Sequence, residues 1–442
     1  MAVIYMYEKE EKQLKNLYDN IQVPIDSLDE AIFAGFQKSK LEEKRQLRRK
    51  KWFISVAAAA IFLFGFLTSI RLSPAFADYI SVIPGMEKIV DLIRTDKGRM
   101  LAVENDYYEK IGVSQEKNGL KFTIDGVIAD ESQLVLFYTI TSKDKQKILE
   151  TEKVQLESFE GKKLELGGIS MGSPLYSENG ATTHSDMFEF YFQSPLQEKK
   201  LQLKVWVKGK KVKEEFTINF ELNKDIQLKK SFVINKTISM EGQKITFLNA
   251  DIYPLRVAVH VKMDPNNSKR ILSFDDLRLV DENGETWNKI NNGITANLIS
   301  PDEAVIYLQS NYFREPKELY LVFNKIQAVD KDKAFVVVDT VKRQILKQPK
   351  GNLLRNLRVE GNELIFDLHT KKEFNAFLFT RITDGNGKEL PSNYGFTEGM
   401  NEKGITEFGV SIPNPKHQTN PISLELSAYP SWIKGNEKIK VK

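Results

Sequence analysis

Hydrophobic and polar residues follow three different patterns along this chain of 442 residues. In residues 1–51, short apolar stripes recur at helical spacing, and an uncharged apolar run then extends from Trp52 to Ile70. From about Val113 onward, apolar and polar residues alternate with a period of two, in segments rich in β-branched and aromatic residues. The pattern predicts a mainly β chain that begins with short helices and one long apolar helix.

The apolar run is long enough to cross a membrane. As a helix, residues 52–70 would be roughly 28 Å long, close to the hydrocarbon thickness of a bilayer. Lysines and arginines cluster just before the run and only Arg71 follows closely, so the positive-inside rule places the N-terminus in the cytoplasm and the remainder outside. We therefore expect a single-pass protein of the cell membrane, anchored by Trp52, Phe53, Ile61, Phe62, Leu63, Phe64, Phe66, Leu67 and Ile70.

A cleaved signal peptide is the alternative for the same segment. Ala75 and Ala77 are small residues at the spacing that signal peptidase reads. A signal peptide, however, lies within about the first 15–30 residues of a chain and has a shorter apolar region. Here a leader of about fifty residues precedes the run. We therefore favour an uncleaved anchor.

The cytoplasmic leader, residues 1–51, is too small to fold around a core of its own. Ser27 and Glu30 have the spacing of a capping box at the start of a helix. An apolar stripe at helical spacing follows, made of Leu28, Ile32, Phe33 and Phe36. We expect this stripe to bind a cytosolic protein, with attachment to the membrane surface as the alternative.

A short helical segment is expected at residues 71–112, just outside the membrane. Its apolar stripe, which should face a core, consists of Met86, Ile89, Val90 and Ile93.

The strand-rich region contains an internal repeat. Gly119, Gly242 and Gly361 each lie at the turn between two predicted strands, and in the first two repeats another turn glycine follows 42 residues later. Many short strands in units of this size are typical of immunoglobulin-like sandwiches. We expect three such β-sandwich units in tandem outside the membrane, at residues 113–228, 229–347 and 352–442, the third of them shorter.

Composition narrows the classes of function. There are 64 basic and 60 acidic residues, a net charge of +4, whereas nucleic-acid-binding proteins carry a strongly basic face. We therefore expect no nucleic-acid partner. The chain has no cysteine, so it forms no disulfide and no thiolate metal site, which fits the exterior of a Gram-positive cell.

Candidate catalytic and metal-binding motifs are weak. Gly168-Ile169-Ser170-Met171-Gly172 has the spelling of a nucleophile elbow, but that motif requires a turn from a strand into a helix. The segments 281–284 and 384–387 resemble the start of a calcium loop yet lack its bidentate glutamate, which favours hairpin turns. The four histidines are far apart in the chain. We predict no catalytic residue, no metal site and no cofactor, so the protein is not expected to be an enzyme.

Two stretches resemble known families. The sequence RLSPAFADYISVIPGMEKIVDLIRTDKG, residues 71–98, followed by IADESQLVLFYTI, resembles the signature of DUF4179, a family of single-pass membrane proteins from Bacillus-type bacteria. Residues 229–347 resemble the immunoglobulin-like domain, DUF5643, that often follows it. The resemblance implies a negative effector of an extracytoplasmic-function sigma factor, an anti-sigma factor bound to its partner through the N-terminal helices. It implies no catalytic residues.

Two functions are therefore predicted. In the first, the protein is a membrane regulator that couples an extracytoplasmic β-sandwich sensor to a cytosolic sigma factor. In the second, it is a cell-surface binding or structural protein whose immunoglobulin-like units hold cell-wall polymer or another protein. The extracellular ligand is not specified by the sequence in either case.

Overall fold

The structure is a computed structural model that describes residues 10–16, 86–210, 212–290, 295–374, 376–392, 397–399, 401 and 404–442. The chain divides into two units, Met1–Asp78 and Tyr79–Lys442. In the first unit, residues 10–16 form a helix with exposed side chains. In the second, strands predominate among the described residues, which confirms the prediction of a mainly β chain.

The predicted membrane anchor, residues 52–70, lies outside the described residues, as does the predicted partner-binding stripe of Leu28, Ile32, Phe33 and Phe36. None of the helices that are described combines the length and the apolar character needed to cross a bilayer.

Two short helices precede the strands: α4 (Met86–Ile93) and α5 (Lys97–Glu104). The predicted apolar stripe is buried at Met86, Ile89 and Ile93. Val90, the fourth member of the stripe, is half-buried. The stripe therefore faces a core, as its spacing predicts.

The first β domain is one antiparallel sheet. Its strands are β1 (Glu109–Lys117), β2 (Leu120–Ala129), β3 (Gln133–Ser158), β4 (Leu166–Ser170), β5 (Leu175–Phe192), β6 (Lys200–Gly209) and β7 (Lys213–Glu221). The long strand β3 pairs with β2 and β5 along its first half and with β6 along its second half. All seven strands therefore belong to a single hydrogen-bonded sheet, whereas the sequence predicted a two-sheet sandwich.

The core of the first β domain is aromatic. Tyr138 stacks against both Phe122 and Phe188, with ring centroids 5.0 and 4.4 Å away. The far ends of the sheet meet, because the backbone N–H of Thr217 on β7 donates to the Gln115 side chain on β1 at 2.9 Å. The sheet thus closes around its own core.

The second β domain has two sheets. One contains β8 (Lys230–Met240), β9 (Gln243–Ile252), β10 (Arg256–Met263), β15 (Glu303–Gln309) and β14 (Ala296–Ser300). The other contains β11 (Lys269–Phe274), β16 (Leu319–Asp330), β12 (Arg278–Asp281), β13 (Thr286–Trp287) and β25 (Trp432–Lys440). Their shared core includes Phe247, Phe274 and Phe323, and Trp287 is fully buried within it.

The third β domain also has two sheets. One contains β18 (Gln344–Lys347), β17 (Phe335–Asp339), β24 (Ile422–Leu426) and β21 (Phe379–Thr383). The other contains β19 (Leu354–Glu360), β20 (Glu363–His369), β23 (Ile405–Ser411) and β22 (Thr397–Glu398). Short 3-10 turns lie at Lys331–Lys333 and Pro415–His417.

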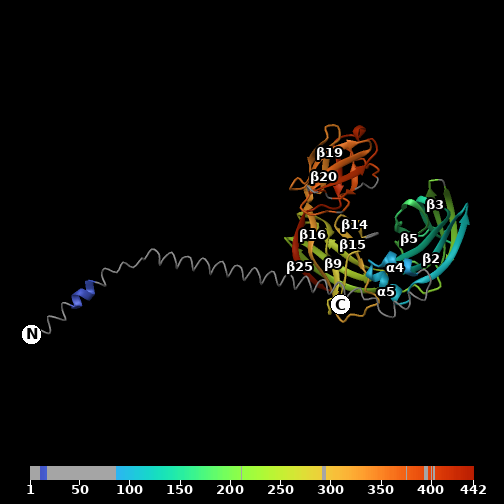
Figure 1. Ribbon diagram of the computed structural model, residues 1–442, viewed down its shortest axis with the longest axis horizontal. Coiled ribbons are helices and arrows are strands. Elements are labelled where there is room, and N and C mark those ends of the chain that lie inside the picture. The colour runs from blue at the N-terminus through green and yellow to red at the C-terminus, as the bar shows by residue number, and fades with distance from the viewer. Residues whose placement is uncertain are drawn as a thin grey trace, which may run out of the picture. The chain divides into compact units, whose positions relative to one another are not determined.

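The boundary between the second and third β domains differs from the one predicted at 347–352. Each domain contains a segment that the prediction assigned to the other. The last strand, β25, pairs with β16 of the second β domain, and Ile433 and Ile439 are buried in that domain's core (Figure 1). Strands β17 and β18 instead belong to the third β domain. The third β domain is therefore an insertion between two strands of the second. A period-two pattern shows that a strand has one buried face, but it does not show which core buries that face.

Candidate functional site: the junction around helix α5

Helix α5 begins at a capped turn. Asp96 precedes the helix in an extended conformation, with φ −107°, and its carboxylate accepts a hydrogen bond from the Arg99 backbone N–H at 3.1 Å. A cap of this kind stabilises a helix by about 1 kcal/mol. The cap fixes where the helix starts and hence the position from which Arg99 reaches the first β domain.

Arg99 joins helix α5 to the first β domain through a buried ion pair. Its Nη2 lies 2.6 Å from Glu189 Oε2 on β5, and its Nε lies 3.2 Å from Asp96 Oδ2. Glu189 also accepts hydrogen bonds from the Gln133 side-chain amide, at 3.1 Å, and from the Tyr191 hydroxyl. Burial alone would lower the pKa of the Arg99 guanidinium, but Asp96 and Glu189 beside it hold that pKa above its usual value. Arg99 therefore remains charged, and removing either partner would leave a buried charge without full compensation.

The opposite side of helix α5 contacts the second β domain. Lys97 Nζ lies 2.6 Å from Glu285 Oε1 and 4.6 Å from the centre of the Trp287 ring. At Gly98 the helix approaches the backbone so closely that a Cβ atom there would lie 2.5 Å from Ser310 N. Glycine is therefore required at this position if the helix is to keep its place.

The first and second β domains also contact each other directly. The Arg256 guanidinium lies over the rings of Tyr191 and Tyr307, at 4.9 and 4.2 Å from their centres. It donates to Ser132 Oγ at 3.2 Å and to the Ser132 carbonyl at 3.1 Å. The Leu255 backbone N–H donates to Asp130 Oδ2 at 2.9 Å. Tyr191 contacts both Arg256 and Glu189, so one continuous buried network links helix α5 to both domains.

The motifs singled out in the sequence lie elsewhere. Residues 168–170 are in β4, which runs antiparallel to β5, so Ser170 is not at a turn from a strand into a helix. Asp281 and Asp384 each accept two backbone hydrogen bonds within their own turns, as the hairpin interpretation predicts. Across the described ranges, no three histidine, aspartate or glutamate residues are arranged to hold a metal ion.

The sequence pattern alone does not single out Arg99, Glu189 or Arg256. Glu189 lies between Phe188 and Phe190 in a strand, and simple alternation would place it on a solvent face. In the structure all three residues are buried. Helix α5 covers Glu189 through Arg99, and Arg256 is buried where the first and second β domains meet. One feature of the sequence could have indicated that Glu189 is buried, namely the position of this charged residue inside the aromatic run FEFYF.

Comparisons with known proteins agree with the two resemblances. Residues 46–142 match a family described as "Domain of unknown function (DUF4179)", and residues 229–350 match a "Family of unknown function (DUF5643)". The first match includes α4 and α5, and the second covers most of the second β domain. No curated protein matches the chain.

One solved structure is similar over part of the chain. It is described as "The crystal structure of the conserved domain protein from Bacillus anthracis" and is 17% identical to this chain. The match covers 58% of this chain and 90% of that one, with a TM-score of 0.40. A likeness at this level defines neither the fold nor the function.

Proposed function

We propose that this protein is a single-pass membrane regulator. Its leader lies in the cytoplasm, residues 52–70 cross the membrane as a helix, and the three β domains act outside as a sensor. The leader holds an extracytoplasmic-function sigma factor through Leu28, Ile32, Phe33 and Phe36, so the protein acts as an anti-sigma factor.

The observation that carries this proposal is the position of helix α5. The helix follows closely in sequence after the proposed anchor, and it is fixed to both the first and the second β domain by Arg99 and Gly98. A protein that only displays its domains on the surface would need no more than a flexible linker at this point. With α5 built into the junction, any rearrangement of the two domains displaces the helix and the segment that leads to the membrane.

The immunoglobulin-like assignment is part of the proposal for the second and third β domains. In each of them two antiparallel sheets enclose one core, which supports a sandwich of this type. The first β domain, with one closed sheet, forms a separate type of sensor module.

The alternative is a cell-surface binding or structural protein. A large cavity between the second and third β domains, described below, favours ligand binding and is equally compatible with a sensor. The cytoplasmic leader distinguishes the two proposed functions, because only a regulator requires the leader to bind a partner.

The test is a charge placed on the leader's apolar stripe in the full-length protein. Ile32→Asp with Phe36→Asp puts two carboxylates into the expected groove, and a loss of about 3 kcal/mol lowers affinity more than a hundredfold. Transcript levels are measured by genome-wide sequencing. We expect the same transcripts to increase in this variant and in a deletion strain. Ala31→Asp with Ala34→Asp, which adds the same charge on the other face of the expected helix, should leave transcription unchanged. If transcription is unchanged in both the double variant and the deletion strain, the protein is not an anti-sigma factor.

A further inference from the structure

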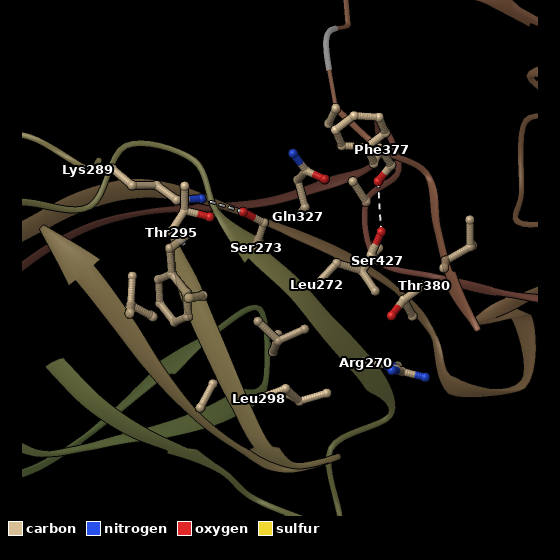
Figure 2. A pocket seen from close by; sticks show the side chains of 18 of the residues that line it. Arg270, Leu272, Ser273, Lys289, Thr295, Leu298, Gln327, Phe377, Thr380 and Ser427 are labelled. Carbon is tan, nitrogen blue, oxygen red and sulfur yellow. Dashed lines mark hydrogen bonds between the residues drawn. The ribbon is translucent and has the colours of Figure 1, made fainter. Parts of the chain in front are cut away.

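A large cavity lies beside the core of the second β domain. Its volume is about 900 Å³, and it is bounded by β11 and β14, the edge strands of that domain's two sheets (Figure 2). The third β domain closes the other side with Glu373, Phe377, Thr380 and Ser427. The two domains thus flank a space that is partly open to solvent.

The walls of this cavity are of mixed polarity, and their apolar part is continuous with the core. Phe274 and Ile306 line it and also belong to the core of the second β domain. Leu298 and Phe377, which also line it, are each 59% exposed. Protein cores are close-packed and rarely contain voids larger than a water molecule, whereas small-molecule sites measure about 300–1,000 Å³. The cavity therefore has the size and lining of a binding site.

One cation in this cavity lacks a counter-ion. Lys289 Nζ donates to Ser273 Oγ at 3.0 Å, and among the described residues it forms no ion pair (Figure 2). Burial lowers the pKa of the Lys289 ammonium, and the charge of Asp275 acts in the opposite direction. An ammonium group has three hydrogens to donate, so Lys289 has hydrogen-bonding capacity beyond Ser273.

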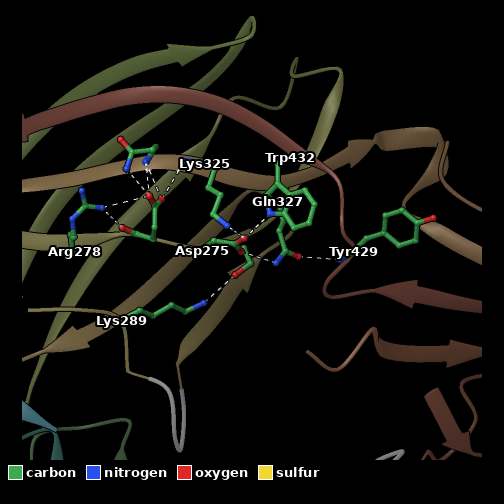
Figure 3. Close-up of polar contacts among 10 residues, drawn as sticks. Asp275, Arg278, Lys289, Lys325, Gln327, Tyr429 and Trp432 are labelled. Carbon is green, nitrogen blue, oxygen red and sulfur yellow. Dashed lines mark hydrogen bonds and ion pairs between the residues drawn. The ribbon is translucent and has the colours of Figure 1, made fainter. Parts of the chain in front are cut away.

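Asp275 is the nearest candidate to neutralise Lys289, but its carboxylate is already occupied. Oδ1 accepts from the Gln327 side-chain amide at 2.7 Å, and Oδ2 accepts from Trp432 Nε1 at 2.5 Å (Figure 3). Lys325 Nζ lies 3.3 Å from the same Oδ2. The acidic group that faces Lys289 is therefore held by three other donors.

Two other charged side chains, Arg270 and Glu373, line the cavity. Arg270 forms an ion pair of 2.6 Å with Glu425. Glu373 is exposed to solvent at the rim. Away from the rim, Lys289 is therefore the charged lining residue that forms no ion pair among the described residues.

We propose that this cavity binds an amphipathic anion. The anionic head, a carboxylate or a phosphate, would accept hydrogen bonds from Lys289 and Ser273. The apolar body would lie along Phe274, Leu298, Ile306 and Phe377. The proposal does not depend on the regulatory function, because binding is measured directly and without reference to transcription.

The experiment uses the full-length protein in membranes and dodecanoate that carries a photoreactive diazirine in its chain. After irradiation, the labelled peptides are mapped by mass spectrometry. We expect label on the segments around Leu298 and Phe377. Dodecanoate or dodecyl phosphate should displace it at least tenfold better than dodecanol, dodecylamine or inorganic phosphate. The better of the two anions identifies the head group as carboxylate or phosphate.

Variants then test the role of Lys289. Lys289→Met should lower the potency of the anionic competitors about tenfold, to that of dodecanol, whereas Lys289→Arg should retain it. Lys262→Met, at an exposed lysine on β10 of the same domain, serves as the matched control and should bind like the native protein. Label scattered over the surface, equal competition by all amphiphiles, or competition by inorganic phosphate alone would overturn the proposal. These results do not require the Lys289→Met variant to fold, since the competition series is measured on the native protein.

Discussion

Arg99 on helix α5 and Glu189 on strand β5 are 90 residues apart in the chain, yet they form an ion pair of 2.6 Å with side chains only 4% and 3% exposed. The pair joins the segment after the proposed membrane anchor to the face of the first β domain that lies opposite its aromatic core. A buried pair of this kind makes a specific attachment, because each charge would be buried without a counter-charge if the other were removed.

Removing the carboxylate should release helix α5. Glu189→Ala leaves the Arg99 guanidinium, the Gln133 amide and the Tyr191 hydroxyl without their acceptor, at a cost of about 3–5 kcal/mol. We expect hydrogen exchange in residues 100–103 to accelerate at least a hundredfold, measured by mass spectrometry on the full-length protein. Asp225→Ala, which removes an exposed ion pair with Lys199 in the same domain, is the control and should leave this exchange unchanged. Equal exchange in both variants would show that the pair does not hold the helix.

The pairing of β25 with β16 predicts which fragments fold. The repeat in the sequence predicts that residues 229–347 fold alone, but this fragment lacks Ile433, Ile439 and Val441, which are buried in the same core. Burial of each such side chain contributes about 1.5–3 kcal/mol. We therefore expect residues 229–347 to show no cooperative thermal transition by circular dichroism, and residues 229–442 to show one. A cooperative transition in the shorter fragment would mean that β25 is dispensable.

Membrane topology is tested by protease treatment of intact protoplasts. The charge asymmetry around residues 52–70 predicts that protease digests the chain beyond Arg71 and leaves a protected fragment that contains residues 1–70. The fragment is detected with an antibody against the leader. Recovery of a soluble protein that starts at Asp78 would instead support a cleaved signal peptide.

Local features of the fold followed from the sequence, and long-range ones did not. Alternation predicted β6, where Leu201, Leu203, Val205 and Val207 are buried, and helical spacing predicted the buried stripe of α4. The partners of each strand are set by packing between distant segments. The sequence therefore did not show that β25 returns to β16, or that β3 pairs with β6 as well as with β2 and β5.

The candidate site was hidden for the same reason. Arg99, Glu189 and Arg256 lie in three separate segments, and each resembles an ordinary surface charge until the domains are assembled. The cavity at Lys289 is lined by residues of both the second and the third β domain, which are distant in the sequence. No local motif encodes either arrangement.

The central claim is that helix α5 transmits the state of the β domains to the cytoplasm. The most direct measurement is genome-wide transcription in strains that produce Gly98→Ala, Glu189→Ala or Asp225→Ala, compared with the native protein and with a deletion, at matched protein levels in membranes. A Cβ at residue 98 would clash with the Ser310 backbone, so Gly98→Ala detaches the helix from the second β domain as Glu189→Ala detaches it from the first. We expect both variants to shift the transcripts that the deletion shifts, and Asp225→Ala to match the native protein. If the deletion changes transcription while Gly98→Ala and Glu189→Ala behave as native, helix α5 does not transmit the signal and the account is wrong.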